Sequence, residues 1–216
     1  MVLIGITGGI ACGKTLVARL FEAHGVPVIF ADSLARSVLD SCSDVLVEIV
    51  ACFGERVLDT NGSIDRRVLG QTVFADASGR RKLELLTHPH ILRLAQIEAT
   101  KLQERGHMLA AFEAALLVEC GLADAFRPLV VVTVDPATQL RRLQERDGLS
   151  ESQAIERIAT QASAREKTAV ADHVIDTGVS IDEVALLVRS TLRSICVDTG
   201  ISVERFPLLR CVDVRA

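Results

Sequence analysis

The sequence predicts an α/β fold in which a parallel five-stranded sheet is covered by helices on both faces. Short apolar runs alternate along the chain with longer stretches of helical spacing. Parallel strands require this order because each crossover between them usually contains a helix. At 216 residues the chain is long enough for one well-buried core with a small inserted module. The predicted strands are residues 2–7, 26–31, 108–118, 129–134 and 172–176.

The first predicted strand leads directly into a glycine-rich loop with the pattern G-x-x-x-x-G-K-T/S. In such a loop the glycines let successive backbone N–H groups turn toward a phosphate, and the following helix adds its positive dipole end. Lys14 can reach the outer phosphates, and Thr15 offers a hydroxyl to Mg²⁺. The flanking strand and helix favour this reading over an incidental glycine turn. The predicted nucleotide-phosphate site is Gly8, Gly9, Ile10, Ala11, Cys12, Gly13, Lys14, Thr15 and Leu16.

A candidate catalytic residue follows the helix after the loop, at the end of the second predicted strand. Val17, Leu20 and Phe21 recur at helical spacing, and Gly25 marks the end of that helix. The second strand then ends at Asp32. A carboxylate at the carboxyl edge of a parallel sheet can take a proton from an acceptor hydroxyl, or hold Mg²⁺ through water. It can equally cap a helix beginning near Ser33, and the residue pattern leaves both possibilities open.

Residues 36–106 separate the second strand from the third and are too long for a simple crossover. Their pattern is helical, with a polar turn at residues 59–62, so we expect a helical insertion beside the sheet. Within it, His88 and His90 flank Pro89. Two imidazoles without a nearby cysteine or acidic partner make a poor metal site, and we expect Pro89 to set the start of a helix from His90 onward.

Helix-start signals are clear in the second half of the chain. Asp135-Pro136 combines an N-cap acceptor with proline at the first helical position, and capping boxes begin at Ser150 and Ser180. Between these starts lies the basic segment 141–147, which includes Arg142. Guanidinium groups near a phosphate loop can neutralise charge on a transferring phosphoryl group. A charged helix face is also often merely solvated, so the segment alone does not decide its role.

The overall composition argues against several function classes. The net charge is −4, there is no dense basic block, and Trp and Tyr are absent, so neither duplex binding nor base stacking on single strands is supported. Six cysteines are scattered without a C-x-x-C pair, which favours reduced thiols. With no long apolar run and no basic leader, we expect a cytoplasmic protein that binds neither membrane nor nucleic acid. The oligomeric state stays open, with a monomer as the expectation.

Cys12 is a special case because it lies beside Lys14 at the start of a helix. This placement can lower the pKa of a thiol. We nevertheless favour a role for Cys12 as a small loop residue.

Beyond the loop, ordered motifs from about Leu3 to Gly178 resemble those of the dephospho-coenzyme A kinase family. No single motif is decisive, but their order and spacing are specific. They are residues 5–10, Ala31-Asp32 with Ala35-Arg36, Phe53-Gly54, Asp65-Arg66, Val73-Phe74, Leu83-Glu84, His88-Pro89, residues 116–119, Gln139 with Arg142 and Arg146-Asp147, Gln161, and residues 171–175.

The resemblance implies a P-loop kinase-like fold and a specific reaction. The γ-phosphoryl group of ATP would pass to the ribose 3′-hydroxyl of dephospho-CoA, giving CoA and ADP, with Mg²⁺ required. The insertion 36–106 would be the substrate domain and residues 137–171 the lid. The catalytic residues would be Asp32 as base, Lys14 and Arg142, and Arg146 would contact ATP. The implied substrate-binding residues are Asp32, Arg36, Asp65, Arg66, His88, Pro89, Leu117 and Glu119.

The chain departs from the usual family pattern at several positions. Phe30 replaces the first residue of Asp-Ala-Asp, Ala11-Cys12 replaces Gly-Ser, Ala115 replaces a proline, Thr177 replaces an asparagine, and the basic residues near Arg165 are shifted. The alternatives are another P-loop small-molecule or nucleoside monophosphate kinase, and a non-catalytic nucleotide binder. A GTPase is disfavoured, because the D-x-x-G match at Asp59 lies in the insertion and no Asn-Lys-x-Asp signature follows.

Overall fold

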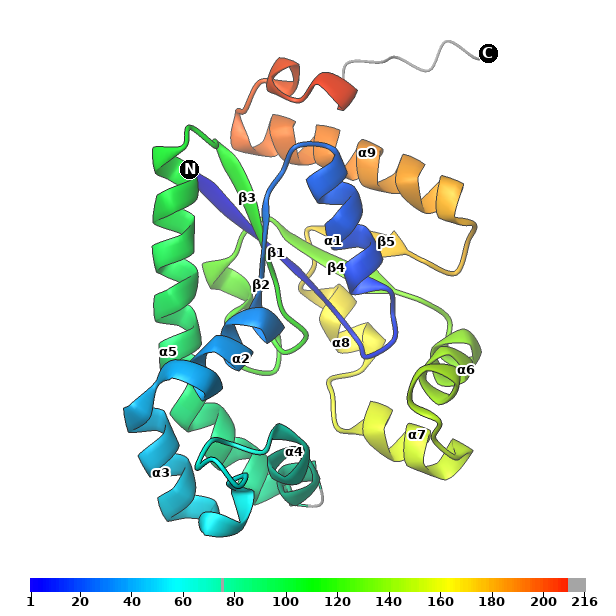
Figure 1. The fold of residues 1–216 in the computed structure, drawn as a ribbon. Helices are drawn as coiled ribbons and strands as arrows, with labels where there is room; N and C mark the ends of the chain where they lie inside the picture. Colours follow the sequence, from blue (N-terminus) through cyan, green and yellow to red (C-terminus); the bar gives the residue numbers. More distant parts are fainter. Residues whose placement is uncertain (75, 210–216) are drawn as a thin grey trace. The chain divides into compact units, whose positions relative to one another are not determined.

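The computed structural model describes residues 1–74 and 76–209, and its sheet confirms the predicted α/β class. Five strands are arranged in the order β2-β3-β1-β4-β5, and the pairings β1–β3, β1–β4 and β4–β5 are parallel. The order places β1, which leads into the glycine-rich loop, at the centre of the sheet (Figure 1). The strands are β1 (Val2–Gly8), β2 (Val28–Phe30), β3 (Leu109–Glu113), β4 (Leu129–Thr133) and β5 (His173–Asp176).

The chain forms two compact units, of which the first comprises residues 1–29 and 101–216. Its central strands are buried on both faces, and for this reason they are continuous apolar runs rather than alternating patterns. α1 and α9 pack side by side, with Phe21, Val188 and Leu192 fully buried (Figure 1). The helices are α1 (Lys14–Ala23), α6 (Pro136–Asp147), α7 (Glu151–Ala159), α8 (Ala164–Ala169) and α9 (Ile181–Thr199).

The predicted helix starts of this unit are confirmed. Asp135 accepts a hydrogen bond from the Thr138 amide, and its contacts with Thr138 hold the pKa of its carboxyl below the ordinary value. Complete capping boxes open α7 at Ser150 and α9 at Ser180. A third box at Ser163, not predicted, opens α8. Each cap contributes about 1 kcal/mol by satisfying amides that the helix itself leaves unpaired.

The second unit, residues 30–100, is helical, as predicted for the insertion, although we expected boundaries at 36 and 106. Its polar turn is held by Asp59, whose Oδ1 accepts from the Asn61 and Ser63 amides at 2.8 and 3.0 Å. The elements are α2 (Ala31–Ser41), α3 (Ser43–Phe53), the 3-10 helix η1 (Glu55–Val57), α4 (Arg66–Phe74) and α5 (Ala77–Glu104). The last four residues of α5 belong to the first unit.

Two predicted strands are shorter than expected. β2 ends at Phe30, and Asp32 lies in the first turn of α2 rather than in the strand. β3 ends at Glu113, and the apolar residues that follow form a turn. Apolar residues continue past both strand ends, and Leu117 beyond β3 is buried, so hydropathy alone misplaced both boundaries.

The predicted helix start at Pro89 is wrong, because Pro89 lies inside α5. Proline cannot donate a hydrogen bond to the carbonyl four residues earlier, which is that of Leu85. Leu85 is 70% exposed, so water can reach this part of the helix. No described helix of the structure is both long and apolar enough to cross a membrane.

Candidate functional site

The glycine-rich loop connects β1 to α1 with a backbone that excludes side chains at two points. A Cβ at Gly8 would lie 2.3 Å from the Val132 carbonyl oxygen, so any larger residue would force the strands apart. Gly13 is the N-cap of α1 with φ +82°, in the left-handed region, and no side chain caps the helix. The first amides of α1 are therefore available to an anion.

Ala11 also has a left-handed backbone, with φ +59°. A Cβ in this conformation is crowded by the following carbonyl, which costs roughly 1–2 kcal/mol in an L-residue. The family's usual glycine would avoid this cost, so the departure at Ala11 stores strain in the loop.

We expect Ala11→Gly to raise the free energy of unfolding by about 0.5–1 kcal/mol, because glycine relieves the left-handed strain. Urea unfolding measures the change. Ala185→Gly in the interior of α9 is the matched control, and there the same substitution should lower stability by about 1 kcal/mol. Destabilisation by Ala11→Gly would show that the loop carries no such strain.

The three predicted residues at the start of α1 differ in accessibility. Lys14 opens the helix, and its Nζ donates to the Gly9 carbonyl at 3.1 Å. Thr15 is exposed, and Leu16 is partly buried. The ammonium group thus already lies against the loop, and the Thr15 hydroxyl is open to a ligand.

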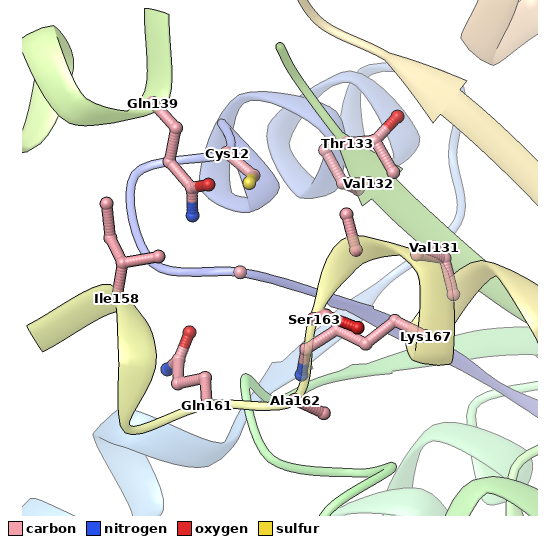
Figure 2. Close-up of a pocket in the computed structure, with 12 residues that line it drawn as sticks. Cys12, Val131, Val132, Thr133, Gln139, Ile158, Gln161, Ala162, Ser163 and Lys167 are labelled. Atoms are coloured by element: carbon pink, nitrogen blue, oxygen red, sulfur yellow. The ribbon is translucent and has the colours of Figure 1, made fainter. Parts of the chain in front are cut away.

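Two glutamines from the predicted lid hold the loop at Ile10. Gln139 on α6 donates from Nε2 to the Ile10 carbonyl at 2.8 Å, and Gln161 Oε1 accepts from the Ile10 amide at 2.7 Å. Both glutamines point into the pocket in Figure 2. This pocket lies between the loop, β4 and the helices α6, α7 and α8; its lining residues include Gly9, Cys12, Thr133, Gln139, Gln161 and Lys167. Neither glutamine was predicted as a site residue.

Arg142, predicted to be catalytic, is anchored to the segment after β5. Its Nη1 and Nη2 donate to Thr177 Oγ1 and to the Thr177 carbonyl at 3.0 and 2.8 Å. The Thr177 hydroxyl in turn donates to the Cys12 carbonyl at 2.9 Å. Arg142 is therefore connected to the glycine-rich loop through a residue at which the chain departs from the family pattern.

Arg146, the other predicted lid residue, is exposed and paired with its neighbour Asp147 at 2.8 Å. Arg157 of α7 bonds to the same carboxylate at 2.9 Å. Hydrogen bonding to Arg146 outweighs partial burial and lowers the pKa of Asp147. These contacts join α6 to α7 within the predicted lid.

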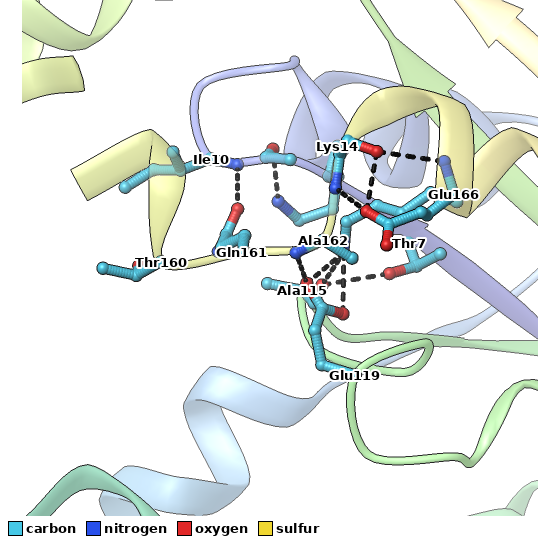
Figure 3. A network of polar contacts seen from close by, with 12 residues as sticks. Thr7, Ile10, Lys14, Ala115, Glu119, Thr160, Gln161, Ala162 and Glu166 are labelled. Carbon is cyan, nitrogen blue, oxygen red and sulfur yellow. Dashed lines mark hydrogen bonds and ion pairs between the residues drawn. The ribbon is translucent and has the colours of Figure 1, made fainter. Parts of the chain in front are cut away.

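An ion pair in the predicted lid joins Lys167, which is buried, to Glu119, which lies at the surface. Figure 3 shows Glu119 with its neighbours Ala115 and Ala162. Lys167, 1% exposed, donates to both carboxylate oxygens of Glu119 at 2.6 and 2.8 Å and to the Ala115 carbonyl at 3.0 Å. Glu119 Oε1 also accepts from the Ala162 amide. Glu119 was predicted to bind substrate, but its carboxylate is engaged in these contacts. Leu117, with the same predicted role, is buried in the core and would contact a Cβ at Gly5.

Glu113 is a candidate site residue that the sequence analysis missed. It ends β3, next to β1, where it pairs in register with Ile6, and it is only 6% exposed. A carboxylate at the carboxyl edge of the strand beside the phosphate loop suits metal chemistry. The signal was present, since Glu113 is the acidic residue of an apolar run, but the predicted strand extended past it to residue 118.

In the second unit, Asp32 and Arg36 are both exposed on α2, four residues apart and hence on one face. The alternative that Asp32 caps a helix starting near Ser33 is wrong, because α2 starts at Ala31 and its N-cap, Phe30, makes no side-chain cap. The carboxylate is thus free of a capping role.

The other predicted substrate residues of this unit have varied contacts. Asp65 Oδ1 accepts from the Arg67 and Val68 amides at 2.9 and 3.0 Å, which is the contact of a helix cap. Arg66 lies 3.7 Å from Asp40 at the surface. His88 is partly buried and Pro89 exposed.

His90, unlike our expectation, does have a nearby cysteine. Cys42 Sγ lies 3.6 Å from His90 Nδ1. Within residues 1–74 and 76–209, no group of three His, Cys, Asp or Glu side chains is arranged to hold a metal ion. A two-residue Cys–His contact alone is too small a ligand set for a structural metal site.

The suggestion that the Cys12 thiol has a lowered pKa is wrong. Burial raises the pKa of Cys12 and outweighs the attraction of Lys14. The role as a small buried loop residue is consistent with its 4% exposure. Five cysteines of the described residues are free thiols, and Cys211 lies outside the described residues.

Comparison with known sequences identifies dephospho-CoA kinases among the relatives of this chain. A sequence model of the family described as dephospho-CoA kinase matches residues 2–183. The dephospho-CoA kinase of Geobacter sulfurreducens is 45% identical over 183 residues, covering 85% of this chain and 93% of the relative. That of Oryza sativa subsp. japonica is 41% identical over 195 residues, covering 90% and 85%.

Solved structures agree with these sequence matches. A crystal structure from Thermus thermophilus aligns with a TM-score of 0.75 at 28% identity, covering 91% of this chain and 97% of that one. The dephospho-CoA kinase from Campylobacter jejuni aligns with a TM-score of 0.57 at 26% identity, covering 89% and 96%.

Proposed function

The chain belongs to the dephospho-CoA kinase family, and we propose from this membership how its own residues carry out the family's reaction. The protein is a kinase that phosphorylates dephospho-CoA at the expense of ATP, the final step of coenzyme A biosynthesis. The residue assignment depends mainly on one observation. The N-terminus of α1 follows the glycine-rich loop and has no side-chain cap, and Lys14 and Thr15 lie in its first turn. This loop would bind the β- and γ-phosphates of ATP.

Mg²⁺ would accompany ATP, and the oxygen donors near the loop suit it. Thr15 supplies an exposed hydroxyl, and Glu113 supplies a carboxylate at the end of the adjacent strand. Mg²⁺ prefers such hard oxygen ligands and usually keeps waters and substrate phosphates as its other ligands, so a cage of several carboxylates is not needed. The ion would neutralise charge on the phosphates, and Thr15 and Glu113 would hold it.

Glu113→Gln should raise the Mg²⁺ concentration for half-maximal activity by about tenfold or more, because an amide replaces a charged oxygen donor or its orienting partner. Calorimetric titration of Mg²⁺ into the ADP complex should show a parallel loss of affinity. Glu156→Gln, an exposed change on α7, is the control. If the Mg²⁺ dependence of activity did not change, Glu113 would not be a ligand of the metal or a partner that orients one.

On the acceptor side, we propose that Asp32 takes the proton of the ribose 3′-hydroxyl. Its exposed carboxylate is not used as a helix cap, and Arg36 lies on the same helical face. Arg36, Arg66 and His88 would contact the anionic acceptor, whose phosphate groups suit guanidinium and imidazole N–H donors. Asp65 and Pro89 would shape the acceptor site indirectly, Asp65 through the start of α4.

The function is tested by coupled ADP release with ATP, Mg²⁺ and a panel of acceptors: dephospho-CoA, nucleoside monophosphates and shikimate. We expect turnover with dephospho-CoA alone, and phosphate on the ribose 3′-oxygen of the product. Turnover of another acceptor in its place would establish a different P-loop kinase. Nucleotide binding without turnover of any acceptor would establish a non-catalytic binder.

We also infer that the protein works in the cytoplasm. The five described cysteines are free thiols, and a reducing compartment keeps them so. A monomer remains the expectation for the oligomeric state, and sedimentation velocity at micromolar concentration tests it.

A further inference from the structure

Two carbonyls of the glycine-rich loop are bound by side chains from other elements. Gln139 of α6 donates to the Ile10 carbonyl at 2.8 Å, and Thr177, after β5, donates to the Cys12 carbonyl at 2.9 Å. Both donors come from far along the chain, and Thr177 is 2% exposed. The two bound carbonyls are two residues apart, so one peptide group of the loop lies between the two that are held.

These contacts fix the direction of two amides. In a trans peptide the carbonyl of one residue and the N–H of the next point in opposite directions. The bonds from Gln139 and Thr177 therefore turn the Ala11 and Gly13 amides to the opposite side of the backbone. Among the described residues, these two amides have no protein acceptor, whereas the Ile10 amide donates to Gln161. Loop amides that have no protein acceptor are available to bind an anion.

We propose that Gln139 and Thr177 are positioning residues for phosphate binding. They hold two peptide planes so that the Ala11 and Gly13 amides face the phosphates of the nucleotide before it arrives. This preorganisation removes a rotational cost from binding, so its loss should weaken affinity for every nucleotide that places a phosphate in the loop. The inference rests on the proposed function only for the identity of the nucleotide.

Thr177 is suited to this role because its hydroxyl both accepts and donates. Arg142 Nη1 donates to Oγ1 at 3.0 Å, and a charged donor on the oxygen polarises the hydroxyl that bonds to Cys12. The Thr133 carbonyl, at 3.3 Å, is a more distant acceptor for the same proton. Valine has nearly the same shape as threonine but lacks the hydroxyl, and serine retains it.

The test compares Thr177→Val, Thr177→Ser and Gln139→Leu. Calorimetry gives the ADP dissociation constant, steady-state kinetics gives KM for ATP and for dephospho-CoA, and thermal unfolding gives Tm. We expect Thr177→Val and Gln139→Leu each to raise the ADP Kd and the KM for ATP by about tenfold. The KM for dephospho-CoA should stay within about twofold, and Thr177→Ser should bind ADP like the unmodified protein. Gln139→Leu leaves the Arg142 contacts intact, so it separates loop positioning from any effect of Arg142.

Two matched controls make the same kinds of substitution away from the loop. Thr199→Val deletes a hydroxyl that donates to the Ile195 carbonyl at 2.6 Å on α9, and Gln144→Leu changes a second glutamine on α6. Both should leave ADP affinity unchanged. The proposal is overturned if Thr177→Val and Gln139→Leu lower Tm but not ADP affinity, or if Thr177→Ser fails to restore binding. Because ADP binding needs no acceptor, this outcome is independent of whether dephospho-CoA is turned over.

Discussion

Asp32→Asn should lower kcat by about a hundredfold or more while leaving ATP affinity nearly unchanged. Asparagine has almost the same size as aspartate but cannot take a proton from the acceptor hydroxyl. Asp32 is exposed in the first turn of α2 and does not cap the helix, so the substitution should leave local structure intact. Single-turnover phosphoryl transfer, measured by rapid quench, isolates the chemical step from product release.

Asp44→Asn is a closely matched control for this variant. Asp44 is exposed and is the second residue of α3 in the same unit, as Asp32 is the second residue of α2. Both changes remove a negative charge near a helix N-terminus, which costs about 0.3–1 kcal/mol of stability. Only Asp32→Asn should affect turnover. If kcat barely changed in both variants, Asp32 would not be the base.

Helix caps and the glycine-rich loop were predictable from the sequence, because they depend on local patterns of residues. The caps at Asp135, Ser150 and Ser180 and the glycine-rich loop depend on side chains and amides within a few residues of each other. The five strands were found because buried parallel strands are continuous apolar runs, which local hydropathy detects.

What the sequence did not reveal depends on contacts between distant residues. Pro89 looked like a helix start, but α5 continues through it. Glu113 was hidden inside an apolar run whose end hydropathy could not place. Gln139 and Thr177 lie 129 and 165 residues from the loop carbonyls that they bind, and no local pattern encodes such pairs. Their importance emerges only once the parallel sheet brings the strand ends together.

The same contrast applies to the arginines of the predicted lid. The positive charges at Arg142 and Arg146 were visible in the sequence, but their partners were not. Arg142 bonds to Thr177 near the loop, and Arg146 bonds to Asp147 at the surface. Two arginines one helical turn apart on α6 therefore have different surroundings, and the contacts of Arg142 lead through Thr177 to the glycine-rich loop.

Lys14→Ala should weaken ATP binding by about tenfold or more and lower kcat by roughly 10²–10³-fold. Lys14 would act on the outer phosphates both in the bound ATP and in the transition state, so both constants should change. The substitution also removes the Nζ contact to the Gly9 carbonyl, which steadies the loop. Calorimetry with ATP and with AMP separates these effects, because AMP lacks the phosphates that the ammonium group would reach.

Lys82→Ala, an exposed change on α5, controls for the loss of a lysine and should affect neither constant. The comparison of ATP with AMP then decides how Lys14 works. A loss confined to ATP, joined to a loss of kcat, means that the charge acts directly on the β- and γ-phosphates. Equal losses for both nucleotides would mean that Lys14 mainly supports the loop backbone through Gly9. Unchanged ATP binding would contradict the assignment of this loop as the phosphate site, since no other residue of the loop carries a positive charge.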